Sequence, residues 1–426
     1  MQSTRHVLSR RLRWWRAFPA LRHRNFRLFL GGQFVSLCGT WMQSVAHGWL
    51  VLTLSNSPFL VGLVPALGGL PILLFTLYGG VLADRVDKHR FIIVLQAFML
   101  CEAITLAVLT WRHWITVPWV IGIAIFFGFL TAFEVPARQA FVVEMVGKAD
   151  LMNAIALNST AFNVSRVIGP ALAGILIAAA GIAACFAANA LSYVGVIIGL
   201  LMMRWPKGEK PLPAAAGLRG PGFAEGFRFV AGEPWPRAII ILTAVFSIFG
   251  FSFIAMLPVY ARDALGVGAG GYGLLVSSVG VGAAIGALTL AGLGGGTPQE
   301  QLALRTALAF GVVLVLAALM PHFWIAAALL MAAGCVMAVQ GITANSYLQS
   351  SAPDHLRGRV MGFYSWVSLG LAPFGTLQAG WVAERWGVRA SLVVGGGVCA
   401  ACALVLRWVM GGRGDWRGRG GARLGV

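Results

Sequence analysis

The sequence has 426 residues, of which 58% are hydrophobic and 11% are charged. A soluble protein carries about 25% charged residues, so this chain could not cover a water-exposed surface with polar groups, and a soluble fold is excluded. The net charge of +18 would suit nucleic acid, but 27 of the 32 Lys and Arg lie in the termini and in the loops that we assign to one side of a membrane. This asymmetry is the positive-inside pattern, so we expect a lipid bilayer and no nucleic acid as partner.

The chain begins with a basic segment, residues 1–27, that contains eight Arg and no acidic residue. An Arg-rich, acid-free start can mark an organelle transit peptide. Here it runs directly into an apolar segment of full membrane length, so we interpret it as a cytoplasmic arm that sets the topology. No cleavable signal peptide is expected.

Twelve apolar segments follow, each near the length of about 20 residues that a membrane helix needs. An even number of crossings places both termini on one side of the membrane, and the basic ends indicate the cytoplasm. The sequence therefore predicts an all-α integral membrane protein with twelve transmembrane helices in the inner cell membrane. The predicted spans are 28–54, 58–82, 91–111, 117–138, 152–180, 183–203, 238–261, 270–293, 302–320, 323–346, 359–382 and 390–410.

A polar stretch at 204–237 divides the spans into two sets of six. Within it, the apolar residues of 223–230 are spaced for a short helix that lies on the membrane surface. We predict a basic cytoplasmic arm, an N-terminal six-helix half, a cytoplasmic linker, a C-terminal six-helix half and a basic cytoplasmic tail. These regions cover 1–27, 28–203, 204–237, 238–410 and 411–426, respectively.

The loop between the second and third spans carries the string GGVLADRVDKHR at 79–90. Gly80 would let helices approach closely, and an acid that ends a helix beside basic residues can form charge-assisted hydrogen bonds across the boundary between the halves. Such bonds could latch one conformation and break in the other, although an ordinary charged loop that sets topology is the alternative. The candidate latch residues are Gly80, Asp84, Arg85, Lys88 and Arg90.

Three ionisable residues lie inside the predicted spans, where charge is costly and usually marks function. Glu102 lies about 16 Å deep in the third span at 1.5 Å per residue, and it is a candidate proton carrier. Glu134 stands one turn before Arg138, so an i,i+4 ion pair is the alternative to a functional role. Arg166 could pair with an acid and fix helix packing, or contact an anionic group of a cargo. We also consider the hypothesis that Glu102 pairs with Arg166, although the sequence gives no distance between the two residues.

The fifth span contains the string SRVIGPALAG at 165–174. Pro170 removes a backbone donor and bends a helix. Gly169 and Gly174 permit close contact with a neighbouring helix. We expect a kinked, closely packed helix that acts as a seal or hinge where the two halves meet.

A weak internal repeat relates the halves. Residues 158–174 can be aligned with 364–380 at an offset of 206, which places Gly174 on Gly380. Separately, Gly62 can be aligned with Gly273 at an offset of 211. Two repeated halves are a feature of several transporter folds.

These motifs resemble the major facilitator superfamily over essentially the whole chain. The string at 79–90 resembles its signature loop, and 165–174 resembles the Gly-Pro motif of its antiporter branch, with Ser165 and Ala173 where Gly is typical. Shorter strings resemble the branch that contains enterobactin exporters and macrolide efflux pumps: RNFR at 24–27, PARQA at 136–140 and LRGRV at 356–360.

Two features depart from the pattern of this superfamily. The second-half counterpart of the signature loop, AGLGGGTP at 291–298, has no Asp-Arg pair. Any cytoplasmic latch is therefore expected to be asymmetric. The fourth span also lacks the mid-membrane Arg that many proton antiporters of the superfamily carry.

The resemblance implies a monomeric secondary transporter that alternates between two access states, with protons as the coupling partner. We expect it to export an amphipathic small molecule, drug-like or siderophore-like, because the spans hold many apolar and aromatic side chains and few charges. The chain has no GxxxxGK[ST] phosphate loop, so it is not expected to be an ATP-driven pump by itself. No cofactor, metal or enzymatic reaction is expected. A facilitator-type importer of a small nutrient is the main alternative; a membrane enzyme or lipid-handling protein and a non-transporting receptor are others.

Overall fold

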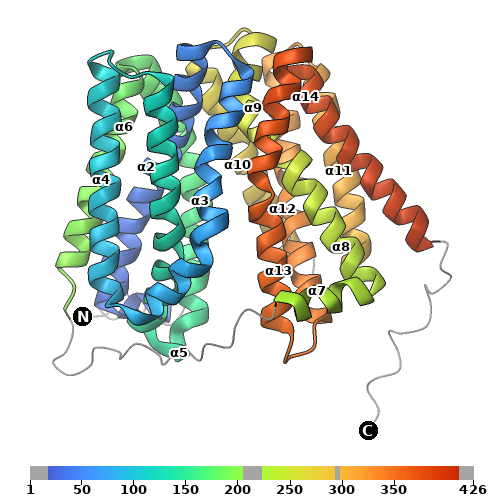
Figure 1. Ribbon diagram of the computed structural model, residues 1–426, viewed down its shortest axis with the longest axis horizontal. Helices are drawn as coiled ribbons and strands as arrows, with labels where there is room; N and C mark the ends of the chain where they lie inside the picture. The colour runs from blue at the N-terminus through green and yellow to red at the C-terminus, as the bar shows by residue number, and fades with distance from the viewer. Residues whose placement is uncertain (1–17, 205–222, 293–297, 412–426) are drawn as a thin grey trace, which may run out of the picture.

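The computed structural model describes residues 18–204, 223–292 and 298–411, and within these ranges the chain is helical apart from short turns (Figure 1). A 3-10 helix, η1, precedes the first long helix, and two π-helical turns, η2 and η3, interrupt the seventh crossing. The elements are η1 (Pro19–Arg22), α2 (Arg24–Ser55), α3 (Pro58–Arg85), α4 (Lys88–Trp111), α5 (Val117–Ala180), α6 (Ile182–Leu201), α7 (Phe223–Gly232), α8 (Pro234–Val245), η2 (Phe246–Gly250), α9 (Phe253–Val259), η3 (Tyr260–Ala264), α10 (Ala269–Gly292), α11 (Gln299–Leu319), α12 (Phe323–Ser351), α13 (Arg357–Gly370) and α14 (Ala372–Gly411).

Ten segments of the described residues are long and apolar enough to cross a membrane. The last of them, Arg357–Met410, holds two crossings, because Gly387 has a φ of 82° and turns the chain inside α14. Gly147, with a φ of 68°, turns the chain inside α5 in the same way and separates the fourth crossing from the fifth. The 32-residue α2 supplies the first crossing. The predicted all-α membrane fold with twelve crossings is confirmed.

Side chains at the turns explain where two of the first helices begin. The Ser57 hydroxyl accepts the Leu60 N–H at 3.3 Å at the start of α3, and the Asp87 carboxylate accepts the Arg90 N–H at 3.2 Å at the start of α4. The first turn of a helix leaves N–H groups without intrahelical partners, and such side chains satisfy them. The turn between α3 and α4, which carries the signature loop, is therefore short and ordered.

The short helix predicted near 223–230 is present as α7. Phe227 makes an edge contact with Phe363 of α13, with ring centroids 5.7 Å apart, and Glu225 forms an ion pair with Arg359 of the same helix. The predicted end of the linker at 237 falls inside α8, which begins at Pro234. The rest of the predicted linker (205–222), most of the predicted arm (1–17) and the tail from 412 onward lie outside the described residues.

The crossings form two groups, α2 to α6 and α8 to α14, that stand side by side (Figure 1). We call the face at which α2 begins and α3 and α6 end the terminus face, which is the lower face in Figure 1, and the other the opposite face. The groups meet toward the opposite face and diverge toward the terminus face. The short helix α7 lies at the terminus face.

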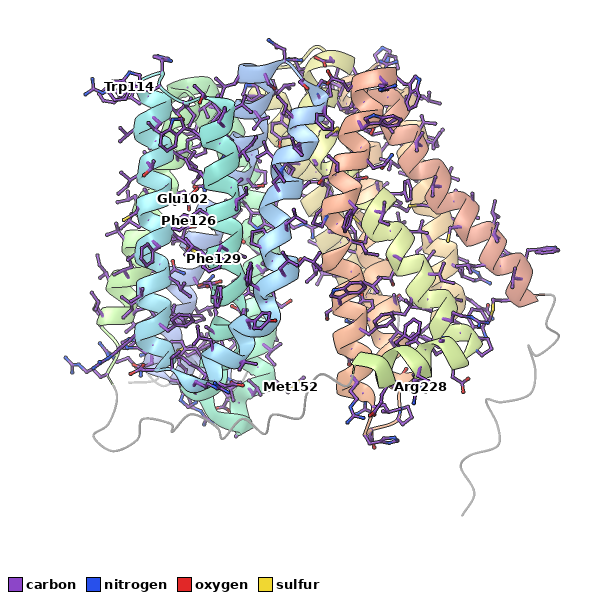
Figure 2. All side chains as sticks on the ribbon, in the orientation of Figure 1. Glu102, Trp114, Phe126, Phe129, Met152 and Arg228 are labelled. Carbon is purple, nitrogen blue, oxygen red and sulfur yellow. The ribbon has the colours of Figure 1, made fainter. Side chains whose placement is uncertain are left out.

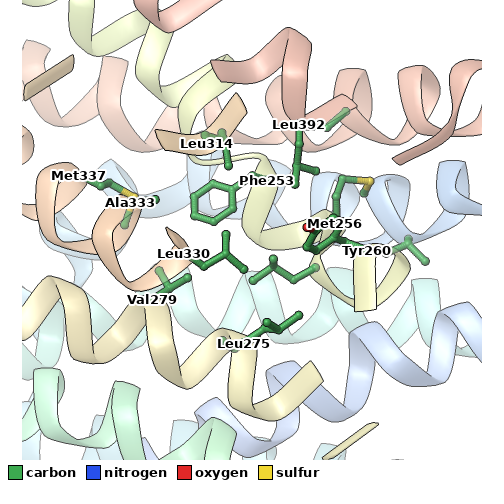
Figure 3. Close-up of a cluster of buried hydrophobic side chains, with 14 of the residues drawn as sticks. Phe253, Met256, Tyr260, Leu275, Val279, Leu314, Leu330, Ala333, Met337 and Leu392 are labelled. Atoms are coloured by element: carbon green, nitrogen blue, oxygen red, sulfur yellow. The ribbon is translucent and has the colours of Figure 1, made fainter. Parts of the chain in front are cut away.

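The second group packs around its seventh crossing, which runs from α8 to η3. Phe253, Met256 and Tyr260 of this crossing are almost fully buried among side chains of α10, α11, α12 and α14 (Figure 3). A close-packed interior resists deformation. The helices of the second group therefore form one closely packed unit.

Candidate functional site

Two helix pairs bring the groups into contact, and glycines make both contacts close. A Cβ atom added at Gly273 of α10 would lie 2.6 Å from the Pro170 carbonyl oxygen and 2.8 Å from the Gly174 Cα, both on α5. A Cβ atom added at Gly62 of α3 would lie against the Thr376 carbonyl oxygen and 2.9 Å from the Gly380 Cα, both on α14. We call these two contacts together the seam.

The seam explains the internal repeat of the sequence. The offset of 206 carries Pro170 onto Thr376 and Gly174 onto Gly380, while the offset of 211 carries Gly62 onto Gly273. The two glycine contacts are therefore the same contact, made once by each pair of equivalent helices. The segment at 165–174 lies between the groups, because Gly169 packs against Cys38 of α2 in its own group while Gly174 packs against α10 of the other.

The seam ends near the middle of the membrane. On one side, a Cβ at Gly280 would lie 2.9 Å from the Arg166 carbonyl oxygen, and the Ser277 hydroxyl donates to the Val167 carbonyl oxygen at 3.0 Å. On the other side, a Cβ at Gly69 would lie 2.8 Å from Pro373 Cγ. From these positions toward the terminus face the groups diverge (Figure 1).

At the opposite face, two charged side chains of the second group hold the turn between α2 and α3. The Glu384 carboxylate accepts the Ser57 hydroxyl at 2.9 Å and the Phe59 N–H at 3.0 Å, at the start of α3. The Arg262 guanidinium donates to the Asn56 side-chain oxygen at 2.8 Å, at the end of α2. A carboxylate at a helix N-terminus and a guanidinium at a helix C-terminus both match the helix dipole. We call this arrangement the clamp; the sequence alone does not single out either charged residue, because their partners lie more than 200 residues away.

The structure corrects the role expected of Gly80. A Cβ at Gly80 would meet no atom within 4 Å, whereas one at Gly79 would meet the Ala132 carbonyl oxygen of α5. Gly79 lies 11 residues, about three helical turns, after Gly68, which also faces α5. Gly80 is rotated about 100° further around the helix and away from that contact.

The charged residues of the signature loop divide into paired and unpaired groups. Lys88 is buried and its Nζ lies 2.7 Å from Glu144 Oε1 of α5, and Arg90 is exposed with its Nε 3.7 Å from the Asp87 carboxylate. Arg85 is exposed, and Asp84 is partly buried. Among the described residues, the Asp84 carboxylate has no hydrogen bond or ion pair, so it is not engaged across the groups in this conformation.

Glu102 lies inside the first group (Figure 2), where its partner is an amide. Gln43 Nε2 of α2 lies 3.0 Å and 3.1 Å from the two carboxylate oxygens. Asn189 of α6 donates to the Gln43 side-chain oxygen at 2.7 Å, and the Ser192 hydroxyl donates to the Asn189 side-chain oxygen at 3.0 Å. The hypothesis that Glu102 pairs with Arg166 is therefore wrong, because α2 and α6 supply its polar neighbours.

The sequence alone does not connect Gln43 and Asn189 to Glu102, because the three residues lie on different helices. One signal was Gly39, one turn before Gln43, where a Cβ would lie on the Asn189 side-chain oxygen and 2.5 Å from the Ser192 hydroxyl. Because Gly39 has no side chain, there is room beside it for the hydrogen-bonded series of Glu102, Gln43, Asn189 and Ser192, which we call the polar chain.

The other two intramembrane charges differ in their surroundings. Glu134 and Arg138 form the predicted i,i+4 ion pair, with Arg138 Nε 2.9 Å from Glu134 Oε1. Arg166 has no ion pair among the described residues, and its Nη2 atom is buried without a hydrogen-bond partner. Glu134 is therefore neutralised by Arg138, whereas Arg166 has no counter-ion among the described residues.

Known proteins share the sequence pattern of this chain. The model of a family described as transmembrane secretion effector matches residues 16–413. The chain is similar to the staphyloferrin A transporter of Staphylococcus aureus, at 25% identity over 364 residues that cover 85% of this chain and 90% of that protein. It is also similar to the enterobactin exporter EntS of Shigella boydii serotype 4, at 26% identity over 343 residues that cover 80% and 81% of the two chains.

Among solved structures, the fold is similar to a bacterial homologue of the human lysosomal transporter Spinster in an inward-facing, unoccupied conformation. The TM-score is 0.71 at 15% identity, over 90% of this chain and 97% of that chain. The nucleoside transporter NupG gives a TM-score of 0.68 at 12% identity, over 91% and 99%. At these identities the likeness shows the fold alone.

Proposed function

Because the chain belongs to the transmembrane secretion effector family of major facilitator transporters, and so is a membrane transporter rather than an enzyme, we propose that it exports an amphipathic small molecule by proton antiport. Similarity to an enterobactin exporter and to a staphyloferrin A transporter supports a siderophore-like cargo. We propose further that the protein acts as a monomer in the inner cell membrane, with both termini in the cytoplasm.

The observation that carries this proposal is a seam that closes the two groups at one face only. Equivalent glycine contacts at Gly62 and Gly273 lie near the opposite face, and the groups diverge toward the terminus face. In transporters with repeated halves, access alternates when one half rocks against the other around a site near the mid-plane. The positive-inside rule assigns the terminus face to the cytoplasm. The described conformation is then open toward the cytoplasm, ready to load a cargo for export.

The polar chain at Glu102 supports proton coupling. No cation pairs with the Glu102 carboxyl among the described residues, and a buried carboxyl of this kind is expensive to keep in a membrane protein and by default suggests function. Gln and Asn amides can present either oxygen or NH₂ groups, and their orientation can reverse. The chain from Gln43 to Ser192 can therefore donate to an ionised Glu102 or accept from a protonated one.

The test uses everted membrane vesicles that contain an acid-quenched pH dye. After the vesicles are energised, a panel of amphipathic drugs and siderophores is added, and wild type is compared with Glu102→Gln and with an empty-vector control. We expect compound-dependent proton release with wild type. In Glu102→Gln this release should fall about tenfold or more, since the exchange removes the proton-binding group at the end of this series of hydrogen bonds. Glu233→Gln, at an exposed acid of the terminus face, is the matched control and should behave as wild type.

Two results would contradict parts of this proposal. Flux of a labelled compound without proton release would leave export standing and remove antiport. Uptake of the compound by intact cells, with no accumulation in everted vesicles, would favour the facilitator-type importer instead.

A further inference from the structure

Arg166 occupies a fixed position at the inner end of the seam. Its carbonyl oxygen faces Gly280 of α10, where an added Cβ would lie 2.9 Å away, and the next residue, Val167, accepts a hydrogen bond from Ser277 of the same helix. The backbone is therefore held between the two groups at the level where they begin to diverge. The half-buried side chain stands near the mid-plane, where sites of such transporters lie.

No acid of the described chain neutralises this guanidinium. The two acids deep in the spans are engaged elsewhere, Glu102 with Gln43 and Glu134 with Arg138. Arg166 has no ion pair among the described residues, and its Nη2 atom is buried without a hydrogen-bond partner. A cation in a membrane protein without an internal counter-ion requires an anion or water from outside the fold.

The repeat argues against a purely structural role. The offset that superposes the two halves of the seam carries Arg166 onto Ala372. In the equivalent contact between α3 and α14, the position that corresponds to Arg166 is therefore occupied by an alanine. The seam does not need a charge there, so the guanidinium serves something that approaches one side only.

The neighbouring side chains on α5 describe what could approach. Phe162 lies one turn before Arg166 and shares its face of the helix. Phe162 is 41% exposed, and its ring makes an edge contact with Trp41, with centroids 5.8 Å apart. A guanidinium one helical turn from an exposed aromatic ring, which itself packs on a partly buried one, suits an organic anion that carries rings of its own.

We propose that the Arg166 guanidinium binds an oxyanion of the cargo, such as a carboxylate, and that it thereby selects ring-bearing organic anions for transport. This assignment rests on the export proposal, because it places a cargo between the groups. Guanidinium groups bind carboxylates with two parallel hydrogen bonds, which an ammonium group cannot reproduce.

The experiment compares acid and amide partners of the same ring system. The probes are 1-naphthaleneacetate with 1-naphthaleneacetamide, together with the ring-bearing siderophores that wild type moves in everted vesicles and their amidated forms. Wild type is tested beside Arg166→Gln, Arg166→Lys and Arg305→Gln, an exposed arginine of α11 that serves as matched control. Each purified protein is also unfolded thermally in detergent, without and with the acid.

We expect wild type and Arg305→Gln to transport acids at least tenfold better than amides. Arg166→Gln should lose this preference, and Arg166→Lys should recover only part of it. Without cargo, the melting temperature of Arg166→Gln should equal or exceed that of wild type, since no internal partner is lost, and the acid should stabilise wild type but not Arg166→Gln.

Three outcomes would overturn the assignment. They are transport of amides and acids alike by wild type, an unchanged acid preference in Arg166→Gln, and a lower cargo-free melting temperature in Arg166→Gln, which would reveal a structural partner. Transport of no compound by wild type would instead contradict the export proposal and remove the premise.

Discussion

A single missing methyl group at Gly273 allows α10 to touch α5. The close approach to the Pro170 carbonyl oxygen and the Gly174 Cα leaves no space for a Cβ atom. Because Gly62 makes the equivalent contact between α3 and α14, the opposite face is closed by two backbone surfaces in direct contact. Closure of this face therefore depends on residue size at these two positions.

Gly273→Ala should force the two groups apart at the seam. Overpacking a close contact costs about 1–3 kcal/mol. Gly122→Ala is the matched control, because Gly122 also stands near the start of a long helix but has no atom within 4 Å of an added Cβ. There the gain in helix propensity, up to about 1 kcal/mol, acts alone. We expect Gly273→Ala to melt below wild type in detergent and Gly122→Ala to melt at or above it; equal melting temperatures would contradict the tight seam.

The buried charges show which residue contacts could be read from the sequence. The Glu134–Arg138 pair follows from i,i+4 spacing on one helix, so the sequence predicts it correctly. The partner of Glu102 is Gln43, which is 59 residues away on another helix. Spacing along the chain carries no information on that contact, and the hypothesis that Glu102 pairs with Arg166 failed for this reason.

At the scale of elements, the clamp joins the ends of two helices in one group to charges in the other. Glu384 binds at the N-terminus of α3, and Arg262 binds at the C-terminus of α2. Both charges have the sign that the helix dipole favours. Opening of the opposite face must separate Glu384 from α3 and Arg262 from α2, so the clamp stabilises the conformation described here.

Glu384→Gln should shift the protein toward the state that is open at the opposite face. Replacing a charged acceptor by a neutral one removes about 1–2 kcal/mol, or about tenfold in the ratio of states. The measurement is a spin-label distance distribution between Thr53 and Arg385, exposed residues of α2 and α14 at this face. A longer distance should gain population in Glu384→Gln.

The control for this change is Arg112→Ala, which removes an exposed charge from the same face. Arg112 stacks on Trp111 and Trp114 of its own group and takes no part in the clamp. Its distance distribution should match that of wild type. An unchanged distribution in Glu384→Gln would show that the clamp does not hold this face.

At the scale of the whole molecule, charge sets the orientation in the membrane. Most Lys and Arg lie in the predicted cytoplasmic loops and termini, and four lie in predicted outer loops: Arg112, Arg262, Arg385 and Arg389. Cytoplasmic loops hold the excess of basic residues. The terminus face should therefore be cytoplasmic, and the face of the clamp should be outside.

Reporter fusions test this orientation. Alkaline phosphatase, which is active only outside the cytoplasm, should be active when fused after Trp114, at the opposite face (Figure 2), and inactive when fused after Lys88. A green fluorescent protein fused after residue 426 should be fluorescent. The reverse pattern would invert the assignment of the two faces, and the described conformation would then be open to the outside of the cell.

The sequence by itself determined the properties that depend on local composition: the apolar spans, the basic loops, the Glu134–Arg138 pair and the repeated glycines. Local sequence suffices for these, because a membrane helix satisfies its backbone hydrogen bonds within its own segment and brings residues four apart together on one face. The tertiary structure alone decided which helix faces meet. It placed Gly79 rather than Gly80 at α5, Glu102 beside Gln43, and Glu384 at the start of α3, and it left Arg166 without an ion pair within the described part of the chain. Those contacts depend on the rotation of one helix against another, which no spacing along a single helix records.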